Sequence, residues 1–257
     1  MKSMTLELNE TVEPYREFYG SNVQQMPLLI SGKDDKGEVI DIPRIPLSVA
    51  GLMERRLNSS KGAWKDNYFD NGDAIVYHPD GKFKIVLDAQ ALREITPKSK
   101  LQNGALILAD GMYEKMQGHE FTRNDAEIIT GRELSPNEVK AHPIWGVVAR
   151  DKTLLQAYVE KMFPEMKERF SYETAMGVYL ASKEKVPTLR VLFAYRLENW
   201  SRLRGLSNLD CGDGRFAGVA PEALSAPGKA IVIPSLETAL SIVNQHLGKT
   251  GIELRAK

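Results

Sequence analysis

Residues 69–90 read FDNGDAIVYHPDGKFKIVLDAQ, and this stretch decides the fold of the first half of the chain. The segments 73–77 and 82–88 alternate in polarity and are rich in β-branched and aromatic residues, which is typical of paired strands. Between them, Pro79 fixes its own φ, Asp80 can hydrogen-bond locally and Gly81 accepts a positive φ, so a turn is expected at 78–81. The stretch therefore predicts a β-hairpin over 73–88.

The open end of this hairpin gathers carboxylates. If 78–81 is the turn, Tyr77 pairs with Lys82 and Asp73 lies opposite Val86. Asp73 and Asp88 then share a face, roughly 7 Å apart, within reach of a shared hydrated cation. Two interpretations stay open. The acids form a metal site, or they are solvated residues at strand ends, where Asp and Asn favour turns and water.

The pattern of Gly-Asp, a strand, an Asp-Gly turn and an apolar strand ending in Asp-x-Gln resembles the core hairpin of PD-(D/E)XK nucleases, including the RecB-like branch. The likeness covers about 20 residues, and short motifs of this kind have low specificity. The resemblance implies that Asp73 and Asp88 are catalytic acids that hold magnesium. It places Gln90 at the position of the lysine that orients the attacking water. Gln90 departs from that pattern, because a neutral amide is neither a cationic stabiliser nor a general base.

Strand patterns dominate the first part of the chain, and helix patterns dominate residues 135–205. We expect a strand at 26–30 and a helix over 47–57 that Ser48 caps. Further helices are expected from 151 to 163 or beyond, over 172–181 and over 187–203, and a strand at 230–233 precedes a last helix from 235. This clustering predicts an α+β fold with a strand-rich N-terminal half, a helical third quarter and a C-terminal strand and helix. A single domain over 1–257 is expected, and a subdivision into 1–125 and 135–257 is compatible with the pattern.

The helix expected over 187–203 carries a charge within its apolar stripe. At 100° per residue, Arg196 falls inside the arc of apolar side chains. A charge there needs a partner, and an internal salt bridge to Glu173 or Glu198 would provide one. The alternative is an arginine that faces a cleft and accepts a phosphate or carboxylate.

Basic and aromatic residues alternate around the same segment. Tyr195 and Trp200 are interleaved with Arg196 and Arg204, which is a modest nucleic-acid footprint, although a solvated helix face gives the same pattern. We take these four residues as candidate binding residues for a nucleic acid or another protein. Arg204 can also neutralise the C-terminus of the expected helix.

Composition excludes several classes of protein. The 257 residues contain 34 Lys plus Arg and 34 Asp plus Glu, so nothing global indicates a nucleic-acid or anionic-membrane partner. The single cysteine, Cys211, excludes an intramolecular disulfide and a Cys-based zinc site, and it suits a reducing cytoplasm. No apolar run is long enough to span a membrane. The glycine-rich stretch 210–218 lacks the spacing of a phosphate-binding loop, so we expect a connecting loop.

Two functional hypotheses follow from these patterns. The first is a soluble intracellular protein that binds a protein or nucleic acid. It is favoured because it requires fewer specific sequence features than a catalytic site does. The alternative is a magnesium-dependent nuclease or phosphodiesterase that uses the hairpin carboxylates. Whether the chain is an enzyme is left open by the sequence.

Overall fold

The computed structural model describes residues 15–59, 62–122, 130–181 and 184–220. The chain divides into residues 1–220 and 221–257, and only the first unit contains described residues. Its elements, in chain order, are β1 (Tyr15–Tyr19), α1 (Asn22–Ser31), β2 (Ile45–Pro46), α2 (Val49–Asn58), α3 (Ala63–Asp66), β3 (Phe69–Tyr77), β4 (Phe83–Val86), α4 (Gln90–Arg93), β5 (Leu101–Gln102), β6 (Ala105–Ile107), α5 (Met112–Lys115), β7 (His119–Phe121), α7 (Pro136–Ala141), α8 (Pro143–Ala149), α9 (Lys152–Phe170), β8 (Val178–Leu180), β9 (Thr188–Ala194), the 3-10 turn η1 (Leu197–Asn199), β10 (Leu203–Gly205) and β11 (Arg215–Val219). The α+β class predicted from the sequence is confirmed.

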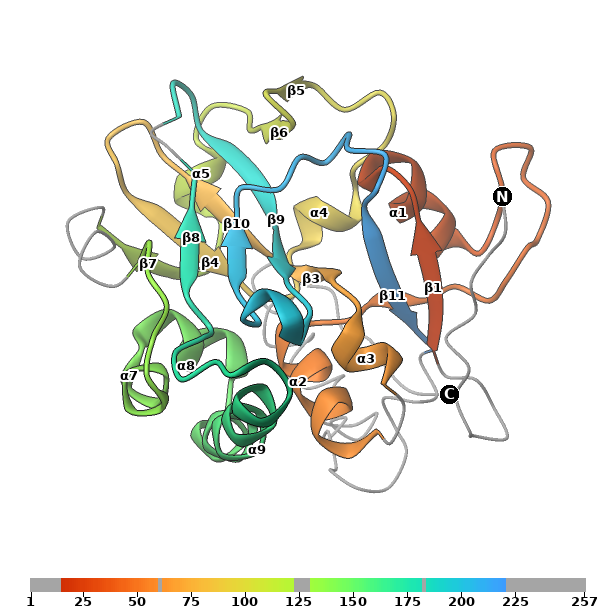
Figure 1. Ribbon diagram of the computed structural model, residues 1–257. Helices are drawn as coiled ribbons and strands as arrows, with labels where there is room; N and C mark the ends of the chain where they lie inside the picture. Colours follow the sequence, from red (N-terminus) through yellow and green to blue (C-terminus); the bar gives the residue numbers. More distant parts are fainter. Residues whose placement is uncertain (1–14, 60–61, 123–129, 182–183, 221–257) are drawn as a thin grey trace, which may run out of the picture. The chain divides into compact units, whose positions relative to one another are not determined.

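A mixed β-sheet organises this unit, with the strand order β1-β11-β3-β9-β10-β8 (Figure 1). β11 pairs antiparallel with β1, where Tyr15 lies opposite Val219, and it pairs parallel with β3. β3 and β9 are antiparallel, whereas β10 and β8 are parallel. β4 pairs with β3 on one side and with β7 on the other. β5 and β6 form a hairpin, and β6 pairs with β9. The sheet thus brings strands from both ends of the described chain side by side.

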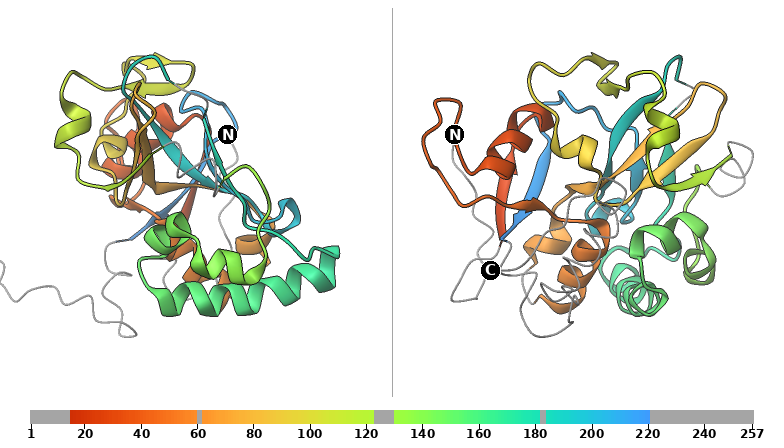
Figure 2. Two further views of the ribbon diagram at one scale, coloured as in Figure 1. Left: turned by 90° about the vertical axis from the view of Figure 1, so that its left-hand side faces the viewer. Right: turned by 180° about the vertical axis from the view of Figure 1, so that it is seen from behind.

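The hydrophobic core lies between one face of the sheet and helices α1 and α4. All nine residues of β3 are buried, as expected for a central strand with partners on both sides. Figure 2 shows α1 and α4 in front of the sheet when the molecule is seen from behind. The side chains that meet here include Phe18, Val23, Met26, Leu29, Ala74, Val76, Leu92, Leu189, Val191 and Phe216.

Helices α2, α7, α8 and α9 gather at one end of the sheet (Figure 1). Ser48 caps α2 as expected, because its side chain accepts a hydrogen bond from the N–H of Gly51 at 3.1 Å. α9 begins after Asp151 and continues through Pro164 to Phe170, so the helix expected there extends beyond 163. Among the described residues, these helices do not cover the middle of the other face of the sheet, which is turned to the viewer in Figure 1.

Three expected helices or strands are wrong, and the second half of the loop expected over 210–218 belongs to β11 (Arg215–Val219). Residues 26–30 belong to α1, where Val23, Met26 and Leu29 are spaced three apart and face the core. The segment 172–181 contains β8, and 187–203 contains β9 and η1, with β10 beginning at its end. β9 pairs with β3, β6 and β10, so nearly all of it is buried, and a continuous apolar run fits a buried strand as well as a helix.

Other expectations fall outside what the structure tests. The strand at 230–233 and the helix from 235 lie outside the described residues. β9 pairs with β3 across the expected subdivision between 1–125 and 135–257, and that subdivision stays a prediction. Within the described residues, none of the helices combines the length and apolar character needed to cross a lipid bilayer.

Candidate functional site

The hairpin over 73–88 is present, with a register one residue away from the expected one. Tyr77 lies opposite Phe83, and Ala74 lies opposite Val86. The N–H of His78 donates to the carbonyl of Lys82 at 2.9 Å, so these two residues close the hairpin and residues 79–81 form the loop. Gly81 has a φ of 94°, which suits a three-residue loop that ends in a left-handed residue. Asp73 is therefore one position beyond the last pair of the hairpin.

Asp73 is a fully buried carboxylate that accepts three hydrogen bonds. One oxygen accepts from the N–H of Val49 at 2.8 Å, and the other accepts from the N–H of Asp88 at 2.9 Å and from Arg150 at 2.8 Å. A second nitrogen of Arg150 donates to Asp88 at 2.7 Å. Burial raises the pKa of Asp73, and the charge of Arg150 opposes that rise. Arg150 thus joins the two acids that the sequence places on one face, and the sequence did not identify this cation.

The third residue of the expected nuclease site points elsewhere. The side chain of Gln90 is exposed and donates to Glu94 at 2.9 Å, one turn along the chain. Within the described residues, no group of three or more His, Cys, Asp or Glu side chains could hold a metal ion. The assignment of Asp73, Asp88 and Gln90 to magnesium-dependent catalysis stays a prediction, and the structure supplies a guanidinium where that prediction places a metal.

Asp70 differs from Asp73 and Asp88 because no described residue forms an ion pair with it. It is 2% exposed, and one of its oxygens accepts the backbone N–H of Arg215 at 2.9 Å. Among the described residues, none places a cationic side chain within ion-pair distance of Asp70. Burial raises the pKa of Asp70 to about 7. This carboxyl group therefore titrates near neutral pH beneath the junction of β3 and β11.

The expected binding residues lie on strands and a tight turn instead of a helix. Arg196 precedes η1 and forms an ion pair with Glu198, which is one of the two partners expected from the sequence. Trp200 follows with a φ of 59°, and the N–H of Tyr195 donates to the carbonyl of Arg202 at 2.8 Å. This turn brings Tyr195 and Trp200 back toward β10, which carries Arg204.

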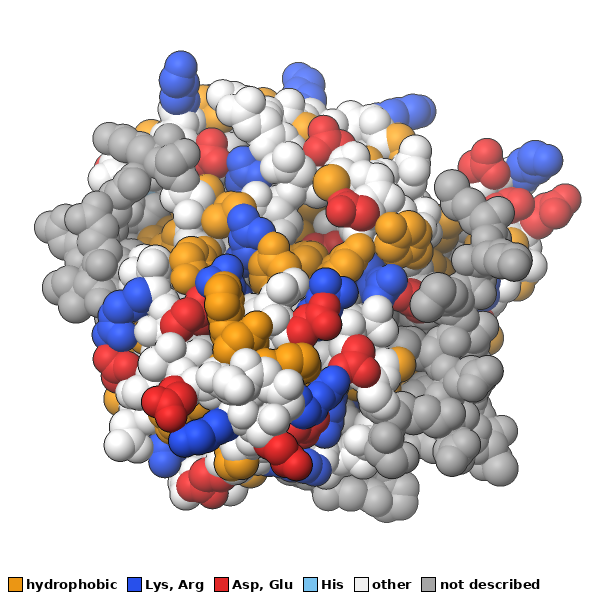
Figure 3. Space-filling model, in the orientation of Figure 1, with side chains coloured by type: hydrophobic (Ala, Val, Ile, Leu, Met, Phe, Trp, Pro, Cys, Tyr) orange, Lys and Arg blue, Asp and Glu red, His pale blue; other side chains and the backbone are white. Residues whose placement is uncertain are grey.

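These residues join a larger set of aromatic and arginine side chains on the uncovered side of the sheet. In register across three strands, Tyr179 of β8 lies opposite Arg204 of β10, which lies opposite Phe193 of β9. Figure 3 shows apolar and basic side chains interspersed across the middle of this face. We call the set the aromatic–arginine face, and it consists of Tyr19, Tyr68, Tyr172, Tyr179, Phe193, Tyr195, Trp200, Arg202, Arg204 and Arg215.

The rings of the aromatic–arginine face hold one another in place. Phe193 stacks on Tyr68 with ring centroids 5.2 Å apart, and it meets the edge of Tyr195 at 4.8 Å. Tyr172 packs against Trp200 at 5.2 Å. Offset and edge contacts of this kind add to the stabilisation that burial alone gives.

The guanidinium groups lie over the same rings. Arg202 is 4.0 Å from the ring centroid of Trp200 and 5.0 Å from that of Tyr179. Arg204 is 5.3 Å from the ring centroid of Tyr195, and Arg215 is 4.8 Å from that of Tyr68. Cations in these positions are attracted by the negative faces of the rings. Alternating contacts therefore connect rings and guanidinium groups along this face.

Most of the positive charge on this face is neutralised from within the chain. Arg202 is paired with Glu133, and Arg215 is paired with the buried Glu17 at 2.7 Å. Arg204 is different. Its guanidinium is half-buried and donates to the hydroxyl of Tyr195, and none of the described residues brings a carboxylate within ion-pair distance of it. Arg204 is therefore a positive charge, held between aromatic rings, whose acidic partner the described residues do not supply.

A buried arginine from outside the face fixes its geometry. Arg56 of α2 is 2% exposed and donates to the carbonyl of Tyr195 at 2.7 Å and to the hydroxyl of Ser201 at 3.2 Å. It also donates to the hydroxyl of Tyr158 on α9 at 3.1 Å. Because Arg56 binds both ends of the 195–201 turn, it holds Tyr195 and Trp200 in one arrangement.

Several members of the face were not found from the sequence. Tyr68 and Tyr179 are far from residues 195–204 along the chain, and only strand pairing brings them together. Alternation in 188–195 is a signal that could have placed Phe193 and Tyr195 on one face, once that segment is read as a strand. Glu133 carries no sequence signal that identifies it as the partner of Arg202.

Comparison with known proteins places the fold and leaves the function open. No family model matches this chain, and no curated protein sequence matches it. A solved structure reported as "Accommodation of massive sequence variation in Nanoarchaeota by the C-type lectin fold" superposes with a TM-score of 0.59 and 14% sequence identity. The match covers 83% of this chain and 100% of that one. The fold of this chain is similar to the C-type lectin fold. At this level of identity the likeness concerns the fold alone.

Proposed function

We propose that this chain is a binding protein and that the aromatic–arginine face is the surface that contacts a protein partner. The observation that carries the proposal is Arg204, a half-buried cation among aromatic rings whose acidic partner the described residues do not supply. A group of this kind is costly to leave unpaired in a folded protein. A carboxylate from a partner would complete it.

The composition of the face supports a protein partner. Tyr, Trp, Phe and Arg are the residues enriched in the central parts of protein–protein interfaces, where a few of them supply most of the binding free energy. The rings are held by one another and by Arg56, so little side-chain freedom is lost when a partner binds. The face is therefore preorganised for contact.

The charge of the face argues against a nucleic-acid partner. Nucleic-acid binding requires several cations that follow the phosphates of the backbone. Here Arg202, Arg215 and the neighbouring Arg196 already have carboxylate partners, and Arg204 is the cation left over among the arginines of the face and its adjoining turn. One available charge suits one carboxylate of a protein better than a row of phosphates.

The similar structure suggests different roles for the fold of this chain and for the residues on its aromatic–arginine face. It is reported to accommodate massive sequence variation on a C-type lectin fold. By analogy, we propose that the sheet and helices of this chain are a scaffold and that the residues of the aromatic–arginine face determine which partner is bound.

A selection of displayed random peptides on the immobilised full chain tests this proposal. We expect the selected peptides to be enriched in Asp or Glu and to lose affinity about tenfold or more for Arg204→Gln. The matched control is Arg16→Gln. It removes another half-buried arginine, one that lies over the ring of Phe18 but is paired with Asp41 at 3.3 Å, and it should leave the affinity unchanged.

Two outcomes would contradict the proposal. One is a set of peptides without acidic residues, or with equal affinity for wild type and Arg204→Gln. The other is salt-sensitive binding of single-stranded oligonucleotides with no peptide enriched, which would favour a nucleic-acid partner. Thermal unfolding of each variant, followed by circular dichroism, shows whether it is folded.

A further inference from the structure

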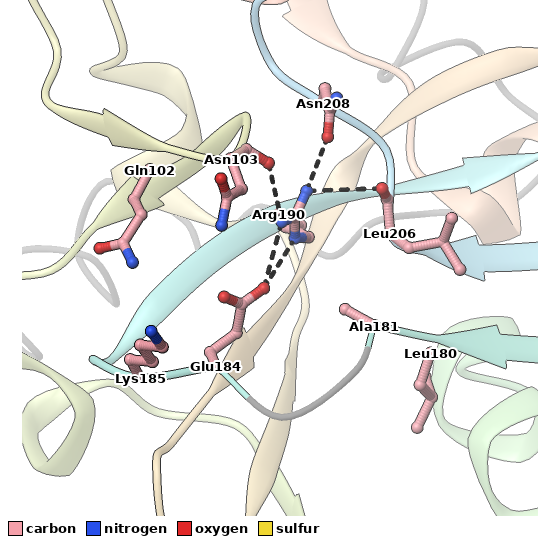
Figure 4. Close-up of a pocket in the computed structure, with 9 residues that line it drawn as sticks. All are labelled: Gln102, Asn103, Leu180, Ala181, Glu184, Lys185, Arg190, Leu206 and Asn208. Atoms are coloured by element: carbon pink, nitrogen blue, oxygen red, sulfur yellow. Dashed lines mark hydrogen bonds and ion pairs between the residues drawn. The ribbon is translucent and has the colours of Figure 1, made fainter.

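A pocket of about 400 Å³ lies beyond the aromatic–arginine face, where the ends of β8 and β10 approach the β5–β6 hairpin. Asn103 and Gly104 form the two-residue turn of this hairpin, and both have positive φ, as the Asn-Gly pair favours. Figure 4 shows the side chains around the pocket. Its lining consists of Gln102, Asn103, Leu180, Ala181, Glu184, Lys185, Arg190, Leu206 and Asn208.

Arg190 forms the rigid floor of the pocket and is not available to a ligand. It is 5% exposed, and its nitrogens donate to Glu184 at 3.1 and 3.3 Å, to the side chain of Asn208 at 2.9 Å and to the carbonyl of Asn103 at 2.9 Å. Further weak bonds reach the carbonyls of residues 206 and 207. Arg190 thereby ties β9 to three other segments and fixes the shape of the cavity.

Four polar groups around the cavity have bonding capacity left. Within the described part of the chain, the side-chain amides of Gln102 and Asn103 and the ammonium group of Lys185 have no bonded partner. Glu184 uses one oxygen for both bonds from Arg190, so its second oxygen can still accept. Figure 4 shows these four side chains directed toward the same side of the pocket.

The opposite side of the pocket is apolar. Leu180 ends β8 and Ala181 follows it, whereas Leu206 follows β10. All three lie away from the four polar groups in Figure 4. The charged side chains of the lining do not balance one another. Glu184 and Arg190 neutralise each other at 3.1 Å, so the pocket keeps one net positive charge, that of Lys185. A ligand that matches this lining has one negative charge, one donor and an apolar tail.

We propose that this pocket binds a small carboxylate with an N–H or O–H donor on the adjacent carbon and an apolar chain, which is the chemistry of α-amino and α-hydroxy acids. The carboxylate contacts the ammonium group of Lys185 and the amide N–H groups of Gln102 and Asn103. The neighbouring donor contacts the second oxygen of Glu184. The apolar chain lies against Leu180 and Leu206. The site uses none of the residues of the aromatic–arginine face, so it is independent of the function proposed above.

Calorimetric titration of the full chain with four related probes tests the proposal. The probes are L-leucine, 2-hydroxy-4-methylpentanoate, 4-methylpentanoate, which lacks the donor, and leucinamide, which lacks the carboxylate. We expect saturable binding of leucine or its hydroxy analogue below about 10 mM, and the stronger of the two identifies the donor that Glu184 accepts. Loss of the donor or of the carboxylate should weaken binding about tenfold.

Lys185→Met should weaken binding by a similar factor, because it removes the charge and keeps most of the side-chain length. Lys185 is exposed, so this variant should fold normally. Lys36→Met removes another exposed lysine, in the turn after α1, and serves as the matched control. The proposal is overturned if neither acid binds by about 10 mM, if 4-methylpentanoate and leucinamide bind as well as the acids, or if Lys185→Met binds like wild type.

Discussion

The ion pair between Arg150 and the buried Asp73 should make a large contribution to the free energy of unfolding, and replacing Arg150 tests this. Replacing Arg150 by methionine keeps the length of the side chain and removes its charge. Asp73 would then be a fully buried carboxylate that keeps its two backbone hydrogen bonds, from Val49 and Asp88, and loses its counter-ion. Breaking a buried pair from one side costs about 3–5 kcal/mol. Because Arg150 itself is 34% exposed and water can enter, we expect about 3 kcal/mol.

The loss should depend on pH in a particular direction. Without Arg150, only the backbone hydrogen bonds from Val49 and Asp88 oppose the rise that burial causes in the pKa of Asp73, so the folded variant takes up a proton more readily than wild type. A protonated Asp73 no longer needs a counter-ion. The difference in unfolding free energy between wild type and Arg150→Met should therefore be larger at pH 8 than at pH 5.

Urea denaturation followed by tryptophan fluorescence measures these free energies, since Trp64 and Trp145 are both buried. Arg169→Met is the matched control. Arg169 also bridges two carboxylates, Asp66 at 2.8 Å and Glu165 at 3.1 Å, but Asp66 is 51% exposed, so its loss should cost less than about 1 kcal/mol. A cost below about 1 kcal/mol for Arg150→Met, or a cost that does not change with pH, would refute the reasoning.

Two further predictions concern the other acids of the hairpin. Asp70 has a folded pKa of about 7, above its unfolded value, so its contribution to stability is greatest below about pH 4 and is lost as the pH rises to 7. The difference of about three between the two pKa values corresponds to about 4 kcal/mol, and Asp70→Asn should flatten the plot of unfolding free energy against pH by that order. An unchanged slope in the variant would count against the shifted pKa. For Asp73 and Asp88, whose charges Arg150 already balances, we expect no heat when magnesium is titrated into the wild-type chain. Heat that disappears in Asp88→Asn would instead favour the nuclease hypothesis.

Local chemistry explains which parts of the candidate site could be predicted. The approach of Asp73 to Asp88 depends on a turn of a few residues, and Pro79 and Gly81 specify that turn by their own backbone preferences. The expected partner of Arg196, Glu198, is two residues away. The one-residue difference in register arose because the number of residues in the loop is decided by Gly81 and the pairing of His78 with Lys82, which residue types alone do not fix.

The aromatic–arginine face was only partly predictable for a different reason. Tyr195, Trp200 and Arg204 are prominent in the sequence, but their role was derived from a helix that does not form. The apolar run that suggests a helix is the strand β9, of which all residues but Phe193 are buried, and periodicity does not separate a buried strand from a helix. Tyr68 and Tyr179 join the face only because β9 and β10 pair with distant strands.

The sequence by itself determined the β-hairpin, the Ser48 cap, the start of α9 after Asp151 and the α+β class. These features depend on interactions among residues a few positions apart, whose geometry the side chains themselves restrict. Only the tertiary structure decided that Arg150 lies between the two acids and that Arg204 lacks an acidic partner among the described residues. Both facts depend on side chains that are distant along the chain, and only the pairing of strands and the packing of helices determines which of them meet.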